Sequence, residues 1–116
     1  MPGPMSEHLR EMQSAKSRLK ERGFTENLEA WGGFSGHVRA DGVLSAKYKA
    51  LIGMAVGLSK RCAPCVAYHT KAAICEGATD EEVLEAAFIA VLMEGGPAQA
   101  HLGLVLDALD EFAKLR

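Results

Sequence analysis

The chain has 116 residues, of which 48% are hydrophobic and 24% charged, a composition typical of one soluble globular domain. Its formal net charge of -2 gives no sign of the clustered basic surface expected of a nucleic-acid-binding protein. The N-terminal segment lacks the apolar stretch of a signal peptide, and the longest uncharged run, residues 95–106, is too short to span a bilayer. We therefore expect a cytoplasmic protein with a single domain over residues 1–116 and no nucleic-acid or membrane partner.

Apolar residues recur at steps of three and four from the N-terminus onward, which predicts successive helices. The first apolar stripe runs from Met5 to Leu19, and Gly23 is suited to end that helix. The second runs from Leu28 to Val38 and is interrupted by glycines, which weaken a helix by up to about 1 kcal/mol each relative to alanine. These are Gly32, Gly33 and Gly36. Their presence suggests that a neighbouring helix approaches closely.

The middle of the chain predicts two further helices after a turn at residues 40–42. Ser45 is suited to cap the third helix, which should extend to about Ser59. This apolar run lacks the strict alternation of a strand, so a helix is the better interpretation. The fourth helix should begin near Cys62 and stop at Gly77.

The last third of the chain predicts the remaining two helices. Thr79 and Glu82 have the spacing of a capping box, which marks the start of the fifth helix. Gly95, Gly96 and Pro97 break it, and Pro97 suits the first turn of one last helix, which extends to about Phe112. No segment has the pattern of a strand, so we predict an all-α bundle of about six helices.

Reactive side chains converge at one segment, which runs from Cys62 to His69. On a helix, Cys62 and Cys65 are three residues apart and His69 follows Cys65 by four, so all three lie on one face. A thiolate is favoured at a helix N-terminus and beside a histidine, and two adjacent thiols can form a disulfide after one of them is oxidised. His69 is suited to transfer the proton. The sequence therefore predicts a redox-active dithiol that needs no cofactor and no metal.

Other interpretations of the cysteine pair fit the sequence less well. A zinc site would use Cys62, Cys65 and His69 with a fourth ligand such as Cys75 or His101, but the chain has no second pair of ligands at metal-binding spacing. A thioredoxin-like motif would follow a strand, and a c-type haem motif would have histidine directly after the second cysteine. Buried cysteines with a purely structural role remain an alternative.

Several segments together resemble the carboxymuconolactone decarboxylase-like family. They are Leu44–Lys47, Arg61–Cys65, His69–Ala73, Gly77–Val83 and Gly95–Pro97, and they occur in the family's order over roughly residues 25–110. The cysteine pair followed by His69 is similar to the thiol-dependent, alkylhydroperoxidase D-like side of the family. Because the decarboxylases lack this pair, the resemblance does not favour lactone decarboxylation.

The resemblance implies an all-α fold that assembles into trimers or hexamers and reduces hydroperoxides or disulfides. By position, Cys65 resembles the attacking cysteine, Cys62 the resolving cysteine and His69 the proton-relay histidine. A dithiol partner of the lipoyl or thioredoxin kind would restore the thiols. A redox-sensing or binding oligomer that turns over slowly is the alternative function.

The chain departs from the family at the position of a relay glutamate twelve residues before the first cysteine, where it has Ala50. We hypothesise that Glu94 takes over as the carboxylate that orients His69. Outside the motif, we expect Cys75 to be a buried free thiol and Trp31 to anchor the core or an interface. Tyr68 is expected at a subunit interface.

Overall fold

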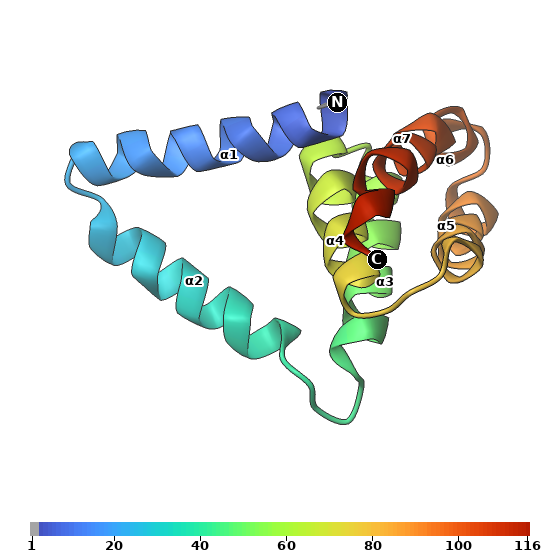
Figure 1. Ribbon diagram of the computed structural model, residues 1–116, viewed down its shortest axis with the longest axis horizontal. Coiled ribbons are helices and arrows are strands. Elements are labelled where there is room, and N and C mark those ends of the chain that lie inside the picture. Colours follow the sequence, from blue (N-terminus) through green and yellow to red (C-terminus); the bar gives the residue numbers. More distant parts are fainter. Residues whose placement is uncertain (1–2) are drawn as a thin grey trace.

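The computed structural model describes residues 3–116, and these contain α-helices, one short 3-10 helix and no strand (Figure 1). The elements are α1 (Pro4–Glu21), α2 (Thr25–Arg39), α3 (Ala46–Ser59), α4 (Ala63–Cys75), α5 (Asp80–Glu94), α6 (Gly96–Ala100), α7 (Leu102–Phe112) and η1 (Ala113–Leu115). The predicted all-α class is confirmed. Within the described residues, none of the helices combines the length and the apolar character needed to cross a membrane.

Helices α3 and α4 form the centre of the fold and contact each other more extensively than any other pair. Helix α5 packs on α3, and α7 and the N-terminal part of α1 pack on α4 (Figure 1). The largest fully buried side chains come from all five of these helices: Met5, Met54, Leu58, Val66, Thr70, Val83 and Val105. One continuous core therefore fixes the position of α4, which carries the reactive segment.

The predicted helix starts at Ser45 and Thr79 are confirmed by their hydrogen bonds. Ser45 Oγ accepts from the Tyr48 N–H at 3.3 Å. Thr79 Oγ1 accepts from the Glu82 N–H at 3.1 Å, and the Glu82 carboxylate accepts from the Thr79 N–H at 3.0 Å. Because a cap of this kind contributes about 1 kcal/mol, these contacts define where α3 and α5 begin.

The start of α1 is capped from the other end of the chain. Gly3 supplies no side chain, and the Glu111 carboxylate accepts instead from the N–H groups of Met5 at 3.2 Å and Ser6 at 2.9 Å. A Cβ at Gly3 would lie within 2.4 Å of the Glu111 carboxyl carbon. This cap ties α1 to α7, and no local motif signals it.

The expected single helix after Pro97 is two helices, α6 and α7, separated at His101. In a continuous helix, the Pro97 carbonyl would accept from the His101 backbone N–H. The His101 ring nitrogen Nδ1 lies 2.8 Å from that carbonyl instead, and the His101 N–H bonds to the Ala98 carbonyl at 3.1 Å. The side chain thus competes with the backbone for the same acceptor, which breaks the helix.

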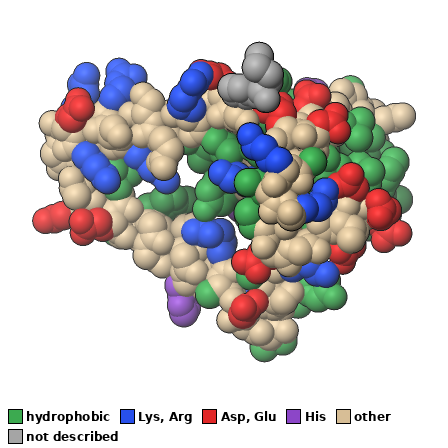
Figure 2. Space-filling model, in the orientation of Figure 1, with side chains coloured by type: hydrophobic (Ala, Val, Ile, Leu, Met, Phe, Trp, Pro, Cys, Tyr) green, Lys and Arg blue, Asp and Glu red, His purple; other side chains and the backbone are tan. Residues whose placement is uncertain are grey.

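Helix α2 stands away from the core, and none of its residues is buried (Figure 1). Its apolar side chains are largely in solvent; Trp31 is 64% exposed and Phe34 is 61% exposed. The expectation that a neighbouring helix explains Gly32, Gly33 and Gly36 is wrong within residues 3–116, because nothing lies within 4 Å of a Cβ built at any of them. Figure 2 shows an opening bounded by α1, α2 and the rest of the molecule.

Candidate functional site

The turn between α3 and α4 builds the site directly onto the end of α3. The Arg61 N–H bonds to the Leu58 carbonyl at 3.0 Å, and the Cys62 N–H bonds to the Gly57 carbonyl at 2.9 Å. This pair of bonds is a Schellman motif, whose left-handed residue is usually glycine. Here it is Arg61, with φ of 54°. The motif ends α3 at Ser59 and places Cys62 at the N-cap of α4.

Cys62 and Cys65 are joined by a disulfide, with their Cα atoms 5.2 Å apart. Cys62 is the N-cap of α4, and its sulfur accepts from the Cys65 N–H at 3.3 Å. The prediction that the two sulfurs meet in the first turn of this helix is confirmed. Both residues are partly exposed, so the pair is accessible from solvent.

Two glycines of α3 allow α4 to approach closely at the reactive residues. A Cβ at Gly57 would lie 2.8 Å from the Cβ of Cys65, and a Cβ at Gly53 would lie 2.7 Å from Nδ1 of His69. Both distances are well below van der Waals contact. Since Gly53 and Gly57 are four residues apart, they share one face of α3. Sequence reasoning missed both, although their small-residue spacing before the cysteine pair was a visible signal.

His69 lies one turn after Cys65, on the side of α4 that faces α3. Its Nδ1 atom is buried and has no hydrogen-bond partner within residues 3–116. The Tyr68 ring meets the imidazole edge-on, with ring centroids 5.1 Å apart, and the Arg39 guanidinium lies 5.5 Å from the Tyr68 centroid. Burial lowers the pKa of His69 below its usual value of 6.5, and the positive charge of Arg39 lowers it further.

A small cavity of about 40 Å³ adjoins the imidazole. It is lined by Arg39, Ala46, Ala50, His69, Ala72 and Glu76. Ala50 is thus beside the histidine, as its position in the motif suggested. The hypothesis that Glu94 orients His69 is wrong for this arrangement, because Glu94 lies at the end of α5, 3.7 Å from Arg61. The carboxylate that lines the cavity belongs to Glu76.

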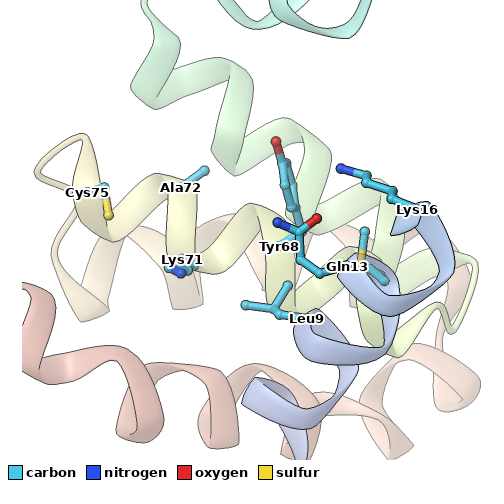
Figure 3. Close-up of a pocket in the computed structure, with 8 residues that line it drawn as sticks. Leu9, Gln13, Lys16, Tyr68, Lys71, Ala72 and Cys75 are labelled. Atoms are coloured by element: carbon cyan, nitrogen blue, oxygen red, sulfur yellow. The ribbon is translucent and has the colours of Figure 1, made fainter. Parts of the chain in front are cut away.

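Cys75 is exposed, so the expectation of a buried thiol is wrong. It lines a larger groove of about 300 Å³ between α1 and α4 (Figure 3). The other lining residues are Leu9, Met12, Gln13, Lys16, Tyr68, Lys71 and Ala72. Ala72 also lines the smaller cavity, so the two spaces are adjacent at this residue of α4.

Metal binding would require several ligands to converge, and the described part of the chain brings no three His, Cys, Asp or Glu side chains together for it. Cys62 and Cys65 are bonded to each other, and His101 contacts the Pro97 carbonyl. The arrangement instead has the parts of a thiol–disulfide site: two sulfurs within bonding reach, a helix N-terminus whose partial positive charge favours a thiolate, and an imidazole one turn away.

Two known proteins are similar in sequence to this chain. The chain is 43% identical over 74 residues to an uncharacterized protein of the cox locus of Paracoccus denitrificans, covering 64% of this chain and 67% of that protein. It is 36% identical over 84 residues to an uncharacterized protein of Cupriavidus necator, covering 70% and 74% of the two chains.

Solved structures of similar proteins have the same fold. A carboxymuconolactone decarboxylase family protein from Legionella pneumophila superposes with a TM-score of 0.88 at 28% identity, covering 94% of this chain and 96% of that one. A family member from Thermotoga maritima, for which an involvement in antioxidative response has been suggested, gives a TM-score of 0.75 at 30% identity, with 90% and 92% covered. The model of the carboxymuconolactone decarboxylase family matches residues 25–108. The chain therefore belongs to the carboxymuconolactone decarboxylase family.

Proposed function

We propose that this protein is a thiol-dependent oxidoreductase that reduces hydroperoxides or disulfides. One observation carries the proposal: Cys62 and Cys65 form a disulfide at an accessible helix N-terminus, one turn from His69. In this scheme Cys65 attacks the substrate, Cys62 resolves the intermediate and His69 transfers the proton. A reducing compartment such as the cytoplasm would keep the pair ready to react.

The reaction with a hydroperoxide has two steps. The Cys65 thiolate attacks one peroxide oxygen, so that an S–O bond forms, the O–O bond breaks and the alcohol leaves. The Cys62 sulfur then attacks the Cys65 sulfur, which forms the disulfide and releases water. Two thiols lose two electrons and the peroxide gains them, so the products are one disulfide, one alcohol and one water.

His69 is suited to the proton transfers. Burial and the charge of Arg39 lower its pKa, which favours the neutral imidazole that can accept the Cys65 proton. The imidazolium then gives that proton to the leaving alkoxide. Residues four apart on a helix have Cβ atoms about 5–6 Å apart, so His69 and Cys65 are neighbours on one face of α4.

Each cycle must end with reduction of the Cys62–Cys65 disulfide. We propose an external dithiol of the lipoyl or thioredoxin kind as the reductant. One of its thiolates attacks a disulfide sulfur to give a mixed disulfide, and its second thiol releases the reduced protein. A disulfide substrate would enter by the same exchange, run in the opposite direction.

The test is alkylation of the three cysteines across pH, followed by mass spectrometry, on reduced protein before and after one equivalent of alkyl hydroperoxide. We expect Cys65 to react well below pH ~8.5, the value of an ordinary free thiol. Peroxide should convert the protein to the Cys62–Cys65 disulfide. If peroxide leaves both thiols reduced, the proposed function is wrong.

Variants separate the three roles. Cys62→Ser should stop at the sulfenic acid of Cys65, and Cys65→Ser should not react with peroxide. His69→Gln should slow the first step by about 10²–10⁴-fold, the usual contribution of a general acid–base. Cys75→Ser is the matched control, because Cys75 is the remaining, exposed thiol and should leave every step unchanged.

A redox sensor that reacts once and recovers slowly is the second candidate. It is favoured by the unpartnered Nδ1 of His69, since a histidine that no carboxylate orients is a poorer relay. A sensor would show one stoichiometric oxidation by peroxide with little turnover when dithiol is supplied. Sustained turnover with a dithiol would favour the enzyme.

We further propose that the protein is a homo-oligomer, a trimer or hexamer, in which α2 is covered by another copy. The supporting observation is the row of exposed apolar side chains on α2, which includes Trp31, Phe34 and Val38. Contiguous exposed apolar surface on a small domain usually marks an interface. Sedimentation velocity gives the subunit number.

A further inference from the structure

The cavity beside His69 is lined by two groups that can each donate a hydrogen bond, the His69 imidazole and the Arg39 guanidinium. Within residues 3–116, Nδ1 of His69 is buried and has no hydrogen-bond partner, and a buried polar atom left unpaired costs about 1–3 kcal/mol. Arg39 lines the same cavity and donates to Ser35 Oγ through Nε at 3.0 Å, so its terminal nitrogens are left for another acceptor. Both groups can donate a proton to one shared acceptor.

The remaining walls are made mostly of methyl groups. Ala46 and Ala50 line the cavity from α3, and Ala72 lines it from α4. Gly53 lies against Nδ1 and follows Ala50 by three residues, so Nδ1 is beside the wall that Ala50 contributes. Helix α3 therefore brings no acceptor to the imidazole, and the cavity stays open where a longer side chain would fill it.

Two charged residues of opposite sign line the cavity. Arg39 comes from the end of α2 and Glu76 from the end of α4, and these are the charged groups in the lining. Both residues are exposed, and within residues 3–116 Glu76 forms no ion pair with Arg39 and no hydrogen bond with Nδ1 of His69. Glu76 therefore leaves the two potential donors in the lining, His69 and Arg39, to an acceptor from outside the described residues.

The size of the cavity limits what can enter. Its volume of about 40 Å³ exceeds the ~10–15 Å³ that one water molecule needs. Two oxygens of one carboxylate fit this space better than a phosphate or sulfate, which has four. We propose that this cavity is a carboxylate-binding site, in which the two oxygens of a carboxylate bind the His69 imidazole and the Arg39 guanidinium.

Binding of a carboxylate and protonation of His69 are coupled. An anion beside the imidazole favours its charged form, so it raises the pKa that burial and Arg39 lower. The affinity for a carboxylate should therefore increase as pH falls through the pKa of His69. A bound carboxylate also supplies the orienting acceptor that His69 lacks. The site would make the proton relay dependent on the ligand.

The test is an NMR titration of the four histidine rings, in sodium formate and in sodium chloride at the same ionic strength. We expect formate to raise the pKa of His69 by about one or more, in a saturable way, with little effect in chloride. His8, His37 and His101 should respond alike to the two salts. This readout does not depend on thiol chemistry, so it can fail or succeed separately from the proposed function.

Variants of the cavity sharpen the test. Ala50→Glu places a tethered carboxylate at the wall, which should raise the pKa of His69 and abolish the response to formate. Ala50→Gln has the same shape without the charge and should block formate without raising the pKa. Arg39→Gln should weaken formate binding by roughly tenfold or more, the usual effect of losing a hydrogen bond to a charged group.

Chain length distinguishes the source of the carboxylate. If hexanoate binds more tightly than formate, the site holds the head of a larger ligand; if hexanoate is excluded, it holds a free small anion. If the pKa values of all four histidines change equally, or if the pKa of His69 changes equally in formate and chloride, the effect is general salt screening. The proposed site is then wrong. Because this arm uses the unaltered protein, the proposal stays testable even if a cavity variant fails to fold.

Discussion

Helix α2 and the α3–α4 hairpin are both apolar, but only the hairpin buries its apolar residues within the chain. Helix α3 buries Leu51, Met54 and Leu58, whereas α2 exposes Trp31 and Phe34. Both segments contain glycines. A Cβ at either glycine of α3 would overlap a reactive residue of α4, whereas a Cβ at a glycine of α2 would have no neighbour within 4 Å among the described residues. The hairpin is covered by α1, α5 and α7, whereas α2 has the surface of a helix that needs a partner.

The largest contrast should appear when an apolar side chain is removed from each region. Leu58→Ala in α3 removes a fully buried side chain and should lower the free energy of unfolding by about 2–5 kcal/mol at every protein concentration. Phe34→Asp in α2 should instead remove the dependence of Tm on protein concentration that an oligomer shows. Calorimetry over a concentration series checks both effects.

Sedimentation velocity provides the control for that pair. Leu58→Ala should keep the mass of the wild-type assembly as long as it is folded, and Phe34→Asp should sediment as a monomer. If Phe34→Asp leaves both the mass and the concentration dependence unchanged, α2 is not the interface.

Replacing a glycine by alanine should change the free energy of unfolding in opposite directions in the two regions. Gly57→Ala would bring a methyl group to 2.8 Å from the Cβ of Cys65, so it should cost about 1–3 kcal/mol and slow disulfide formation. Gly36→Ala meets nothing and should stabilise the protein by about 0.5–1 kcal/mol, because alanine is the better helix former. Urea denaturation measures both. A stabilising Gly57→Ala would show that the close approach of α3 and α4 is not required.

The pH dependence of the free energy of unfolding should report on one residue of the hairpin, His69. Because the pKa of His69 is lowered in the folded state, the unfolded chain binds more protons between that pKa and about 6.5. Stability should be fully present above pH 6.5 and fall as pH decreases through this window. One proton sets an upper limit of about 1.4 kcal/mol per pH unit, and partial exposure of the ring keeps the slope well below it. His69→Gln should lose this slope, while His37→Gln should keep it.

The smallest effect is expected where the two regions meet. Lys49 of α3 donates to the carbonyls of Val38 at 2.8 Å and Ala40 at 2.7 Å, which caps the C-terminal end of α2. Lys49→Met should cost only about 0.3–1 kcal/mol. Hydrogen exchange should speed up in residues 25–39 and stay unchanged in α4. Lys60→Met is the control, and equal exchange in both variants would show that Lys49 does not hold α2.

Features set by neighbours in sequence were predictable. The caps at Ser45 and Thr79 depend on residues three positions away, and so does the meeting of Cys62 with Cys65. A helix brings such residues together whatever the rest of the chain does. Helix starts, the stop at Gly77 and the cysteine pair could therefore be read from the sequence.

Features set by packing between distant segments were not predictable in this way. The interruption at His101 depends on a side chain reaching the Pro97 carbonyl, and the cap of α1 depends on Glu111. The choice of Glu94 as a partner for His69 failed because the sequence does not specify which helix end lies near the imidazole. The exposure of Cys75 likewise depends on how far α1 covers α4.

The glycines of α3 have a consequence for how the site can evolve. Selection at residues 53 and 57 acts on volume rather than on chemistry, because what α4 requires there is the lack of a side chain. A relative that keeps both cysteines but has a bulky residue at the position of Gly57 would hold its α4 further away. The size of that one residue is therefore a useful criterion for deciding which members of the family bring α4 as close to α3 as this chain does.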